Sequence, residues 1–281
     1  MRLIEIHSES VRTGIGHSSK GNQLKWYQDD WWYKADAFGF EGLAEAVTSA
    51  LLEHSSIRDF VRYEPVMIRY KDKAYRGCRC RNFRKESEEL VPLERLSRIY
   101  TGFSLARELA RISDVKQRIL YTEELVRNVT GIGDFGAYLT AMLEMDAFFL
   151  NEDRHTNNIA VLYDAGTKSY HLCPYYDMGL AFFSDTREDY PVGLTYAQCR
   201  EKIEAKPFSA DFDEQMDAAE ELYGVQFQFC IPGNEIMDVL QRHQRDWDHG
   251  EPIYSADEYR RVEEVLRYQA GKYQYFFRNY R

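Results

Sequence analysis

The segment that most constrains this chain is residues 151–185, where polar side chains flank a strand, turn and strand pattern. An apolar helical pattern at 135–150 precedes it. Five strongly polar side chains follow the helix within six positions: Asp153, Arg154, His155, Asn157 and Asn158. A further carboxylate, in Asp177-Met178-Gly179, lies beyond the second strand. A lone Asp or Asn after a helix often only caps a turn, but the complete set predicts a catalytic loop followed by a hairpin.

The spacing within this segment is that of a phosphoryl-transfer site. Such a site needs an aspartate beside the attacking hydroxyl, an asparagine and a second aspartate on the metal, and a lysine on the nucleotide phosphates. In protein kinases the catalytic aspartate precedes the metal-binding asparagine by five positions, and a D-x-G motif follows. Here Asp153 precedes Asn158 by the same five positions, and Asp177 opens a D-x-G. We therefore expect Asp153 at the acceptor hydroxyl and Asn158 and Asp177 on Mg²⁺.

The phosphate-binding lysine is expected upstream, on a strand that a helix follows. Lys34 ends an aromatic-rich hairpin pattern at 23–35, and a helical pattern at 39–53 carries Glu41 and Glu45. A strand lysine held by a helix glutamate positions the nucleotide phosphates in kinases. We assign this pair to Lys34 and Glu45, and the helical phase leaves Glu41 as the alternative.

A phosphate-covering loop is expected before this hairpin, at residues 18–22. Small residues there, Ser19 and Gly21 among them, allow backbone N–H groups to form an anion nest. The segment lacks the G-x-G-x-x-G pattern, so this prediction rests on its place in the chain and on its small side chains.

Periodicity divides the chain into a β-rich part and a helical part. Up to about residue 84, strand patterns at 23–35, 65–70 and 73–80 accompany one helical pattern. The later helical patterns lie at 93–100, 102–112, 114–129, 135–150, 209–223 and 256–275, and one strand, loop and strand interrupts them at 159–176. These patterns predict an α+β fold, with a twisted antiparallel sheet and one helix in 1–84 and a helical domain in 85–281.

Charge and cysteine content narrow the class of protein. The chain of 281 residues has 36 Lys and Arg against 46 Asp and Glu, and this acidic balance argues against a general nucleic-acid binder. No apolar run approaches the roughly 18–20 residues that span a bilayer, and the N-terminus lacks the pattern of a secretory signal. We expect a cytoplasmic protein without a membrane partner. Five cysteines, with only Cys78 and Cys80 close together, predict neither a disulfide framework nor a zinc site.

Several separated blocks resemble one family, the HipA-like kinases, including the CtkA-like branch of single-chain bacterial proteins. The blocks follow one another over most of the chain. They are GNQLKWYQDDWWYKAD and GFEGLAEAVTSALLE within 21–53, GCRCRNF at 77–83, DAFFLNEDRHTNNIAVL through PYYDMGLAFFSD at 146–185, and KPFSADFDEQ at 206–215. The DRHxxN block with a downstream D-x-G is also shared with phosphoinositide kinases, so it indicates the wider kinase superfamily more than any substrate.

The resemblance implies a bilobal protein-kinase-like fold, with Mg-ATP bound between a β-rich N-lobe and a helical C-lobe. It implies that Asp153 orients or deprotonates the acceptor hydroxyl and that Asn158 and Asp177 hold Mg²⁺. It also implies that His155 lies beside the γ-phosphate, where it helps to neutralise charge.

The same resemblance implies how ATP and the acceptor bind. Lys34 would contact the ATP phosphates, and the backbone of the connector at 79–83, which includes Cys80 and Asn82, would meet the adenine. The implied acceptor is a Ser or Thr of a protein, with the enzyme itself among the candidates. The expected activity is therefore that of a Mg²⁺- and ATP-dependent serine/threonine kinase.

Other activities stay open at this point. The DRHxxN block also suits a small-molecule or lipid kinase, although Asp185, Arg187 and Glu188 after the D-x-G form no basic membrane-facing cluster. A pseudokinase or interaction module would keep the fold without the chemistry. Nucleotidyl or adenylyl transfer would use the same metals on another phosphorus atom.

Overall fold

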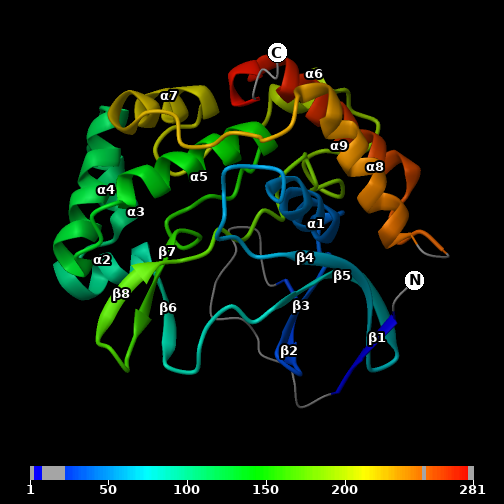
Figure 1. The fold of residues 1–281 in the computed structure, drawn as a ribbon, viewed down its shortest axis with the longest axis horizontal. Coiled ribbons are helices and arrows are strands. Elements are labelled where there is room, and N and C mark those ends of the chain that lie inside the picture. Colours follow the sequence, from blue (N-terminus) through cyan, green and yellow to red (C-terminus); the bar gives the residue numbers. More distant parts are fainter. Residues whose placement is uncertain (1–2, 8–22, 249–250, 278–281) are drawn as a thin grey trace.

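The computed structural model describes residues 3–7, 23–248 and 251–277, which form a sheet-rich part and a helix-rich part (Figure 1). The sheet-rich part consists of β1 (Leu3–Ile6), β2 (Lys25–Gln28), β3 (Trp31–Ala35), α1 (Glu41–Leu52), β4 (Tyr63–Tyr70) and β5 (Lys73–Arg81). The helix-rich part starts with β6 (Glu88–Pro92), α2 (Leu93–Thr101), α3 (Leu105–Arg111), α4 (Val115–Thr130) and α5 (Phe135–Phe149). It continues with β7 (Ala160–Asp164), β8 (Ser169–Leu172), α6 (Tyr196–Arg200), α7 (Phe212–Tyr223), α8 (Ile236–Trp247), α9 (Ala256–Lys272) and the short 3₁₀ helices η2 (Gly233–Glu235) and η3 (Gln274–Phe276).

The larger sheet is mixed rather than antiparallel. Its strand order is β1-β4-β5-β3-β2, and β1 runs parallel to β4 while the other neighbours are antiparallel. The prediction of an antiparallel sheet is therefore wrong at this edge. Strand β1 pairs with β4 and not with its successor β2, so no hairpin sets its direction.

The predicted aromatic hairpin at 23–35 is confirmed as β2 and β3. Asp29 and Asp30 join the strands at φ values of +53° and +64°, the left-handed conformation that two-residue hairpin turns need and that Asp tolerates. Trp26 and Tyr33 face one another across the strands and are both buried. The same register places Lys25 opposite Lys34, so two lysines share one side of the hairpin.

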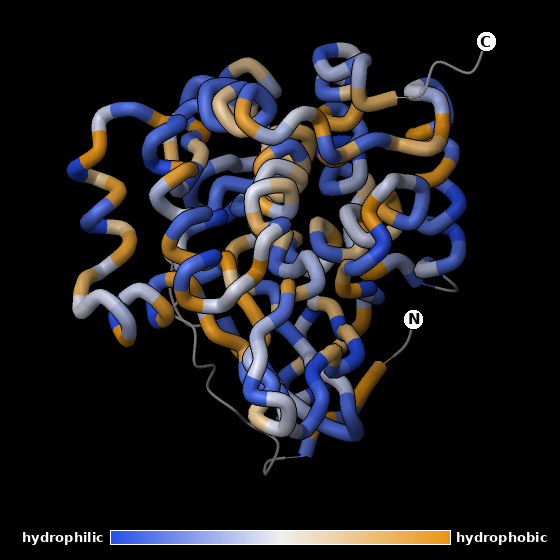
Figure 2. Tube along the Cα trace, turned by 60° about the vertical axis from the view of Figure 1, so that its left-hand side comes forward, coloured by the Kyte–Doolittle hydropathy of each residue, from blue (hydrophilic) through white to orange (hydrophobic). Residues whose placement is uncertain are grey.

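Helix α5 forms the centre of the helix-rich part. Nearly every residue of α5 is buried, as expected of a helix that is apolar all round. It packs against α4, α7 and α9, and α1 packs between strands β4 and β5 and helix α8 (Figure 1). Hydrophobic and hydrophilic positions alternate along the outer helices, which cover this core with one side each (Figure 2).

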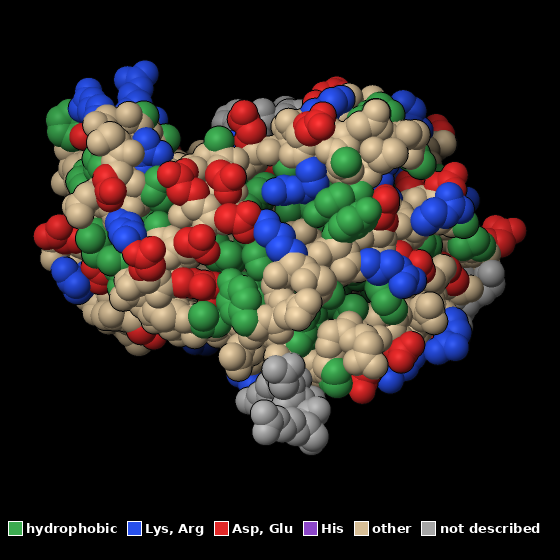
Figure 3. Space-filling model, turned by 90° about the horizontal axis from the view of Figure 1, so that it is seen from above, with side chains coloured by type: hydrophobic (Ala, Val, Ile, Leu, Met, Phe, Trp, Pro, Cys, Tyr) green, Lys and Arg blue, Asp and Glu red, His purple; other side chains and the backbone are tan. Residues whose placement is uncertain are grey.

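A smaller sheet of β6, β7 and β8 lies beside α2 and α3 (Figure 1). The strand pattern at 159–176 is thereby confirmed, but β6 and the amphipathic helix α8 were not predicted from the sequence. On the side seen in Figure 3, Lys and Arg side chains are interspersed with Asp and Glu. Of the helices that the structure describes, none combines the length and the apolar character needed to cross a membrane.

Candidate active site

An open cavity lies between the larger sheet, helix α1 and the loops around β7 and β8. Its lining combines four carboxylates with one amide from the catalytic loop and one lysine from β2. The lining residues are Gln23, Lys25, Phe38, Glu41, Glu45, Asp153, Asn158, Asp177, Gly179 and Leu180. Segments that lie more than 100 positions apart in the chain therefore meet at this cavity.

Lys34 lies at the centre of an ion-pair triad. Its ammonium donates to Glu45 Oε1 at 2.6 Å and to Asp177 Oδ1 at 2.8 Å. The side chain of Glu45 is 2% exposed and that of Asp177 is 24% exposed. The structure therefore brings together the predicted lysine, the preferred glutamate and the aspartate of the D-x-G motif.

The electrostatics of the triad follow from burial and from these charges. Burial lowers the pKa of Lys34, but Asp177 and Glu45 outweigh that effect and hold the pKa well above its usual range. Burial raises the pKa of Glu45, which Lys34 offsets only in part. Burial also opposes ionisation of Asp177, but Lys34 and Lys25 together keep its pKa well below the usual range. Asp177, whose side chain is the less buried and has two ammonium groups near it, is therefore the more acidic of the two carboxylates.

A close approach of α1 to β5 brings Glu45 within reach of Lys34. A Cβ atom on Gly42 would lie 2.5 Å from the carbonyl carbon of Gly77, and one on Gly77 would lie 2.0 Å from the carbonyl oxygen of Lys34. Only glycine fits at these two positions without a shift of the backbone. Glu41 has a different role, because its carboxylate accepts backbone N–H groups of residues 37–39 before the helix. The alternative assignment of the lysine partner to Glu41 is therefore wrong.

The catalytic loop brings Asp153, His155 and Asn158 together. Asn158 Nδ2 donates to the Asp153 carbonyl oxygen at 2.8 Å and lies 3.3 Å from Asp153 Oδ2. His155 Nδ1 accepts the backbone N–H of Asn157, so in the neutral ring the proton is on Nε2. That Nε2 atom lies 3.7 Å from Asp153 Oδ2 and, among the described residues, is buried without a hydrogen-bond partner.

A buried Arg154 holds this loop in place. It forms a two-pronged ion pair with Asp146 of α5, at 2.9 Å and 3.1 Å, and both side chains are almost fully buried. Its third nitrogen, Nη1, donates to the carbonyl oxygens of Asn158 and Tyr176. One guanidinium thus connects α5, the metal-binding asparagine of the predicted site and the residue before Asp177.

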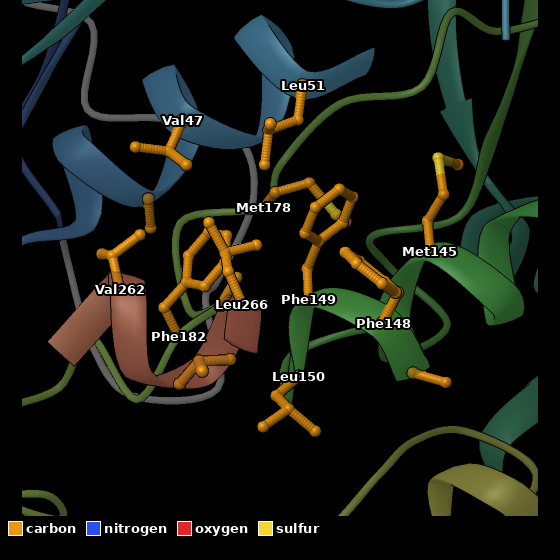
Figure 4. Close-up of a cluster of buried hydrophobic side chains, with 14 of the residues drawn as sticks. Val47, Leu51, Met145, Phe148, Phe149, Leu150, Met178, Phe182, Val262 and Leu266 are labelled. Atoms are coloured by element: carbon orange, nitrogen blue, oxygen red, sulfur yellow. The ribbon is translucent and has the colours of Figure 1, made fainter. Parts of the chain in front are cut away.

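The D-x-G motif is fixed by backbone conformation and by packing. Asp177 has a φ of +65°, an uncommon conformation that concentrates at functional sites. The next residue, Met178, donates its N–H to Glu45 Oε2 at 2.9 Å. Its side chain lies in the apolar cluster between α1 and α5, beside Leu51 and Phe149 (Figure 4). Glu45 therefore ties both Lys34 and the D-x-G backbone to α1.

The predicted adenine connector lies at the end of β5. Cys80 is buried, and burial raises the pKa of its thiol to about 12. Asn82 accepts from Trp32 Nε1 at 3.4 Å, and its backbone N–H donates to Asp30. Neither residue lines the cavity, so their contact with adenine stays a prediction. Ser19 and Gly21 of the expected phosphate loop lie outside the described residues.

Two lysines near this site were not predicted from the sequence. Lys25 lines the cavity opposite Lys34, and counting residues across the hairpin turn would have placed both on one side. Lys206 lies 3.7 Å from Asp153 Oδ1 although it comes more than 50 positions later in the chain. No local sequence pattern around Lys206 predicts that contact.

The donor set of the site suits Mg²⁺. Asn158 and Asp177 both line the cavity and carry oxygen atoms that could hold a metal; Mg²⁺ binds proteins through one or two carboxylates and completes its shell with phosphates and water. Within the described residues, no three His, Cys, Asp or Glu side chains gather as metal ligands. A site of this kind would therefore depend on nucleotide phosphates to complete it.

The fold is bilobal and kinase-like, as predicted. The structure is similar to the crystal structure of CtkA, a proinflammatory kinase of Helicobacter pylori, with a TM-score of 0.62 and 16% sequence identity over 96% of this chain and 95% of that chain. A second match is the Shewanella oneidensis MR-1 toxin–antitoxin complex of HipA, HipB and operator DNA, with a TM-score of 0.46, 13% identity and 93% of this chain against 63% of that chain. No protein-family model and no curated protein sequence matches the chain.

Proposed function

We propose that this chain is a kinase that transfers the γ-phosphate of Mg-ATP to a Ser or Thr hydroxyl of a protein. The observation that carries the proposal is the Lys34 ammonium held between Glu45 and Asp177, two carboxylates that line one cavity together with Asp153 and Asn158. The kinase-like fold and the CtkA kinase among its structural neighbours support it.

In the proposed reaction the residues act by position and charge. Lys34 binds phosphate oxygens, and Glu45 keeps it at the cavity. Asp153 orients the acceptor hydroxyl in line with the γ-phosphate and accepts its proton. Asn158 and Asp177 are the metal ligands; bound Mg²⁺ supplies neutralisation of the phosphate charge. His155 adds an N–H donor near the transferred group.

The first test is nucleotide binding. Mg-ATP at 100 times its dissociation constant stabilises a protein by about 2.7 kcal/mol, which raises the melting temperature of a chain of this size by roughly 5 °C. We expect that shift for the wild type and its loss in Lys34→Met. A melting temperature that does not respond to Mg-ATP contradicts the proposal and favours an interaction module.

The second test is transfer. Pure protein, alone and with a cell lysate, is incubated with γ-labelled ATP, and the labelled species are identified by mass spectrometry. We expect label on Ser or Thr of a protein. Binding without transfer indicates a pseudokinase, and label on a lipid or a small molecule shows that the acceptor class is wrong.

A further inference from the structure

Lys206 brings a positive charge to Asp153 from outside the nucleotide cavity. Its ammonium lies 3.7 Å from Asp153 Oδ1, and its side chain is 40% exposed. Lys206 lies near Oδ1 of Asp153, whereas Asn158 and His155 lie near Oδ2, so the lysine approaches the carboxylate from another side. It opens the block at 206–215, which the proposed function leaves without a role.

The loop that carries Lys206 is held rigidly by a buried glutamine. Gln215 of α7 is fully buried and donates to the Lys206 carbonyl oxygen at 3.1 Å. Its side-chain oxygen accepts the backbone N–H groups of Phe208 and Ser209 at 3.3 Å and 3.4 Å. Phe208 is itself fully buried in the core around α4, α5 and α7. This hydrogen bonding holds the backbone at Lys206, so the side chain extends from a fixed point within reach of Asp153.

On the acceptor side of the site, the negative charge of Asp153 needs a positive charge close to it. Lys34 is opposed by two carboxylates at 2.6 Å and 2.8 Å and belongs to the nucleotide side. A phosphoryl group that approaches a hydroxyl at Asp153 would meet the negative charge of that carboxylate, which repels its oxygens. A cation fixed beside Asp153 offsets this repulsion and attracts the same oxygens, which is the arrangement that stabilises charge in a transition state.

We propose that Lys206 is a catalytic residue whose ammonium binds an oxygen of the phosphoryl group as that group moves from ATP to the acceptor. The inference rests on the proposed kinase function. In the step the acceptor oxygen forms a bond to the γ-phosphorus, and the bond from that phosphorus to the bridging oxygen breaks. The electron pair of that bond leaves with ADP, and the hydroxyl proton goes to Asp153. Lys206 keeps all its bonds and its proton.

The first assay compares Lys206→Met, Lys206→Arg and the control Lys202→Met in the full chain. Lys202 is an exposed lysine four positions earlier, so its replacement removes the same charge from the surface. Transfer of γ-label from Mg-ATP gives kcat and the KM for ATP. We expect kcat to fall at least 100-fold in Lys206→Met with the KM within twofold, Lys206→Arg to recover to within tenfold of the wild type, and Lys202→Met to match the wild type. A kcat for Lys206→Met within threefold of the wild type overturns the inference, as does a raised KM with unchanged kcat.

The second assay needs no turnover. Binding of orthovanadate, which resembles the transferred phosphoryl group, is measured by calorimetry in the presence of Mg-ADP. We expect at least tenfold weaker vanadate binding in Lys206→Met, with ADP binding unchanged. Equal vanadate affinities in the two proteins overturn the inference even where transfer is found. If the wild type transfers no phosphate but the vanadate difference holds, the kinase proposal fails and Lys206 stands as an oxyanion ligand. Absence of vanadate binding in the wild type overturns the inference about Lys206, and the kinase proposal is then decided by the transfer of γ-label alone.

Discussion

Glu45 makes two contacts, and a glutamine at this position can keep only one of them. Its carboxylate bonds to the Lys34 ammonium at 2.6 Å and accepts the Met178 N–H at 2.9 Å. In Glu45→Gln the amide oxygen can still accept from Met178, but the amide N–H₂ group then faces the ammonium. The substitution therefore removes one negative charge from beside Lys34 and leaves Asp177 as its partner.

The cost of Glu45→Gln follows from the distance and the burial. At an effective dielectric constant of about 20, unit charges 2.6 Å apart attract by about 6 kcal/mol before desolvation is subtracted. Breaking a buried ion pair from one side costs about 3–5 kcal/mol. Because Asp177 still pairs with Lys34 at 2.8 Å, we expect a loss below that range, about 2–3 kcal/mol of unfolding free energy. Phosphoryl transfer should fall by about 10²-fold, since Lys34 is no longer held at its position.

Urea unfolding measures the first effect and transfer of γ-label measures the second. The matched control is Glu53→Gln at the end of the same helix, where the partner Arg62 is 64% exposed and the pair is worth less than about 1 kcal/mol. The control should lose little stability and keep the wild-type rate. A Glu45→Gln protein with wild-type stability, and with a transfer rate within threefold of the wild type, would refute the reasoning.

Three further predictions concern other parts of the site. Asp153→Asn should lower transfer by at least about 10³-fold while Mg-ATP binding persists, and a variant that transfers at the wild-type rate removes Asp153 from the mechanism. Arg154→Met leaves the fully buried Asp146 unpaired, so urea unfolding should report a loss of about 3–5 kcal/mol; a loss below about 1 kcal/mol contradicts the proposed anchor. Burial raises the pKa of Asp36 to about 8, so the stability that this raised pKa contributes is fully present below about pH 4, where the unfolded chain also binds the proton, and is lost as the pH rises to about 8. Relative to the wild type, Asp36→Asn should therefore gain stability between pH 5.5 and pH 8, by up to about 1.4 kcal/mol per pH unit, and parallel stability profiles would argue against this.

Local patterns were sufficient to predict most elements and the centre of the site. The hairpin at 23–35, the helix after it and the segment at 151–185 each show a periodicity or a motif spacing that is visible within a short stretch of sequence. They placed Lys34, Asp153, Asn158 and Asp177 where the structure brings them together. The choice between Glu41 and Glu45 needed the structure, because the two lie one turn apart on α1. The structure pairs Glu45 with Lys34, while Glu41 accepts backbone N–H groups before the helix.

Contacts between distant segments could not be predicted in this way. Strand β1 joins β4 in parallel, and the direction of such a pair is not encoded in either strand. Lys206 reaches Asp153 because Gln215 binds its loop and Phe208 fills the core, and neither effect is visible in local periodicity. The position of Lys25 opposite Lys34 could have been predicted, since the register of its hairpin follows from the turn at Asp29 and Asp30.

Paired labelling with α- and γ-labelled ATP is the most direct test of whether this chain transfers the γ-phosphate of ATP. Wild-type protein and Asp153→Asn are incubated with each nucleotide and Mg²⁺, with and without lysate, and the labelled residues are identified by mass spectrometry. If the chain is a serine/threonine kinase, we expect label from γ-labelled ATP alone, on Ser or Thr, and its loss in Asp153→Asn. Label from α-labelled ATP would show nucleotidyl transfer, and ATP binding with no label from either nucleotide would show that the site does no phosphoryl chemistry; either result contradicts the account.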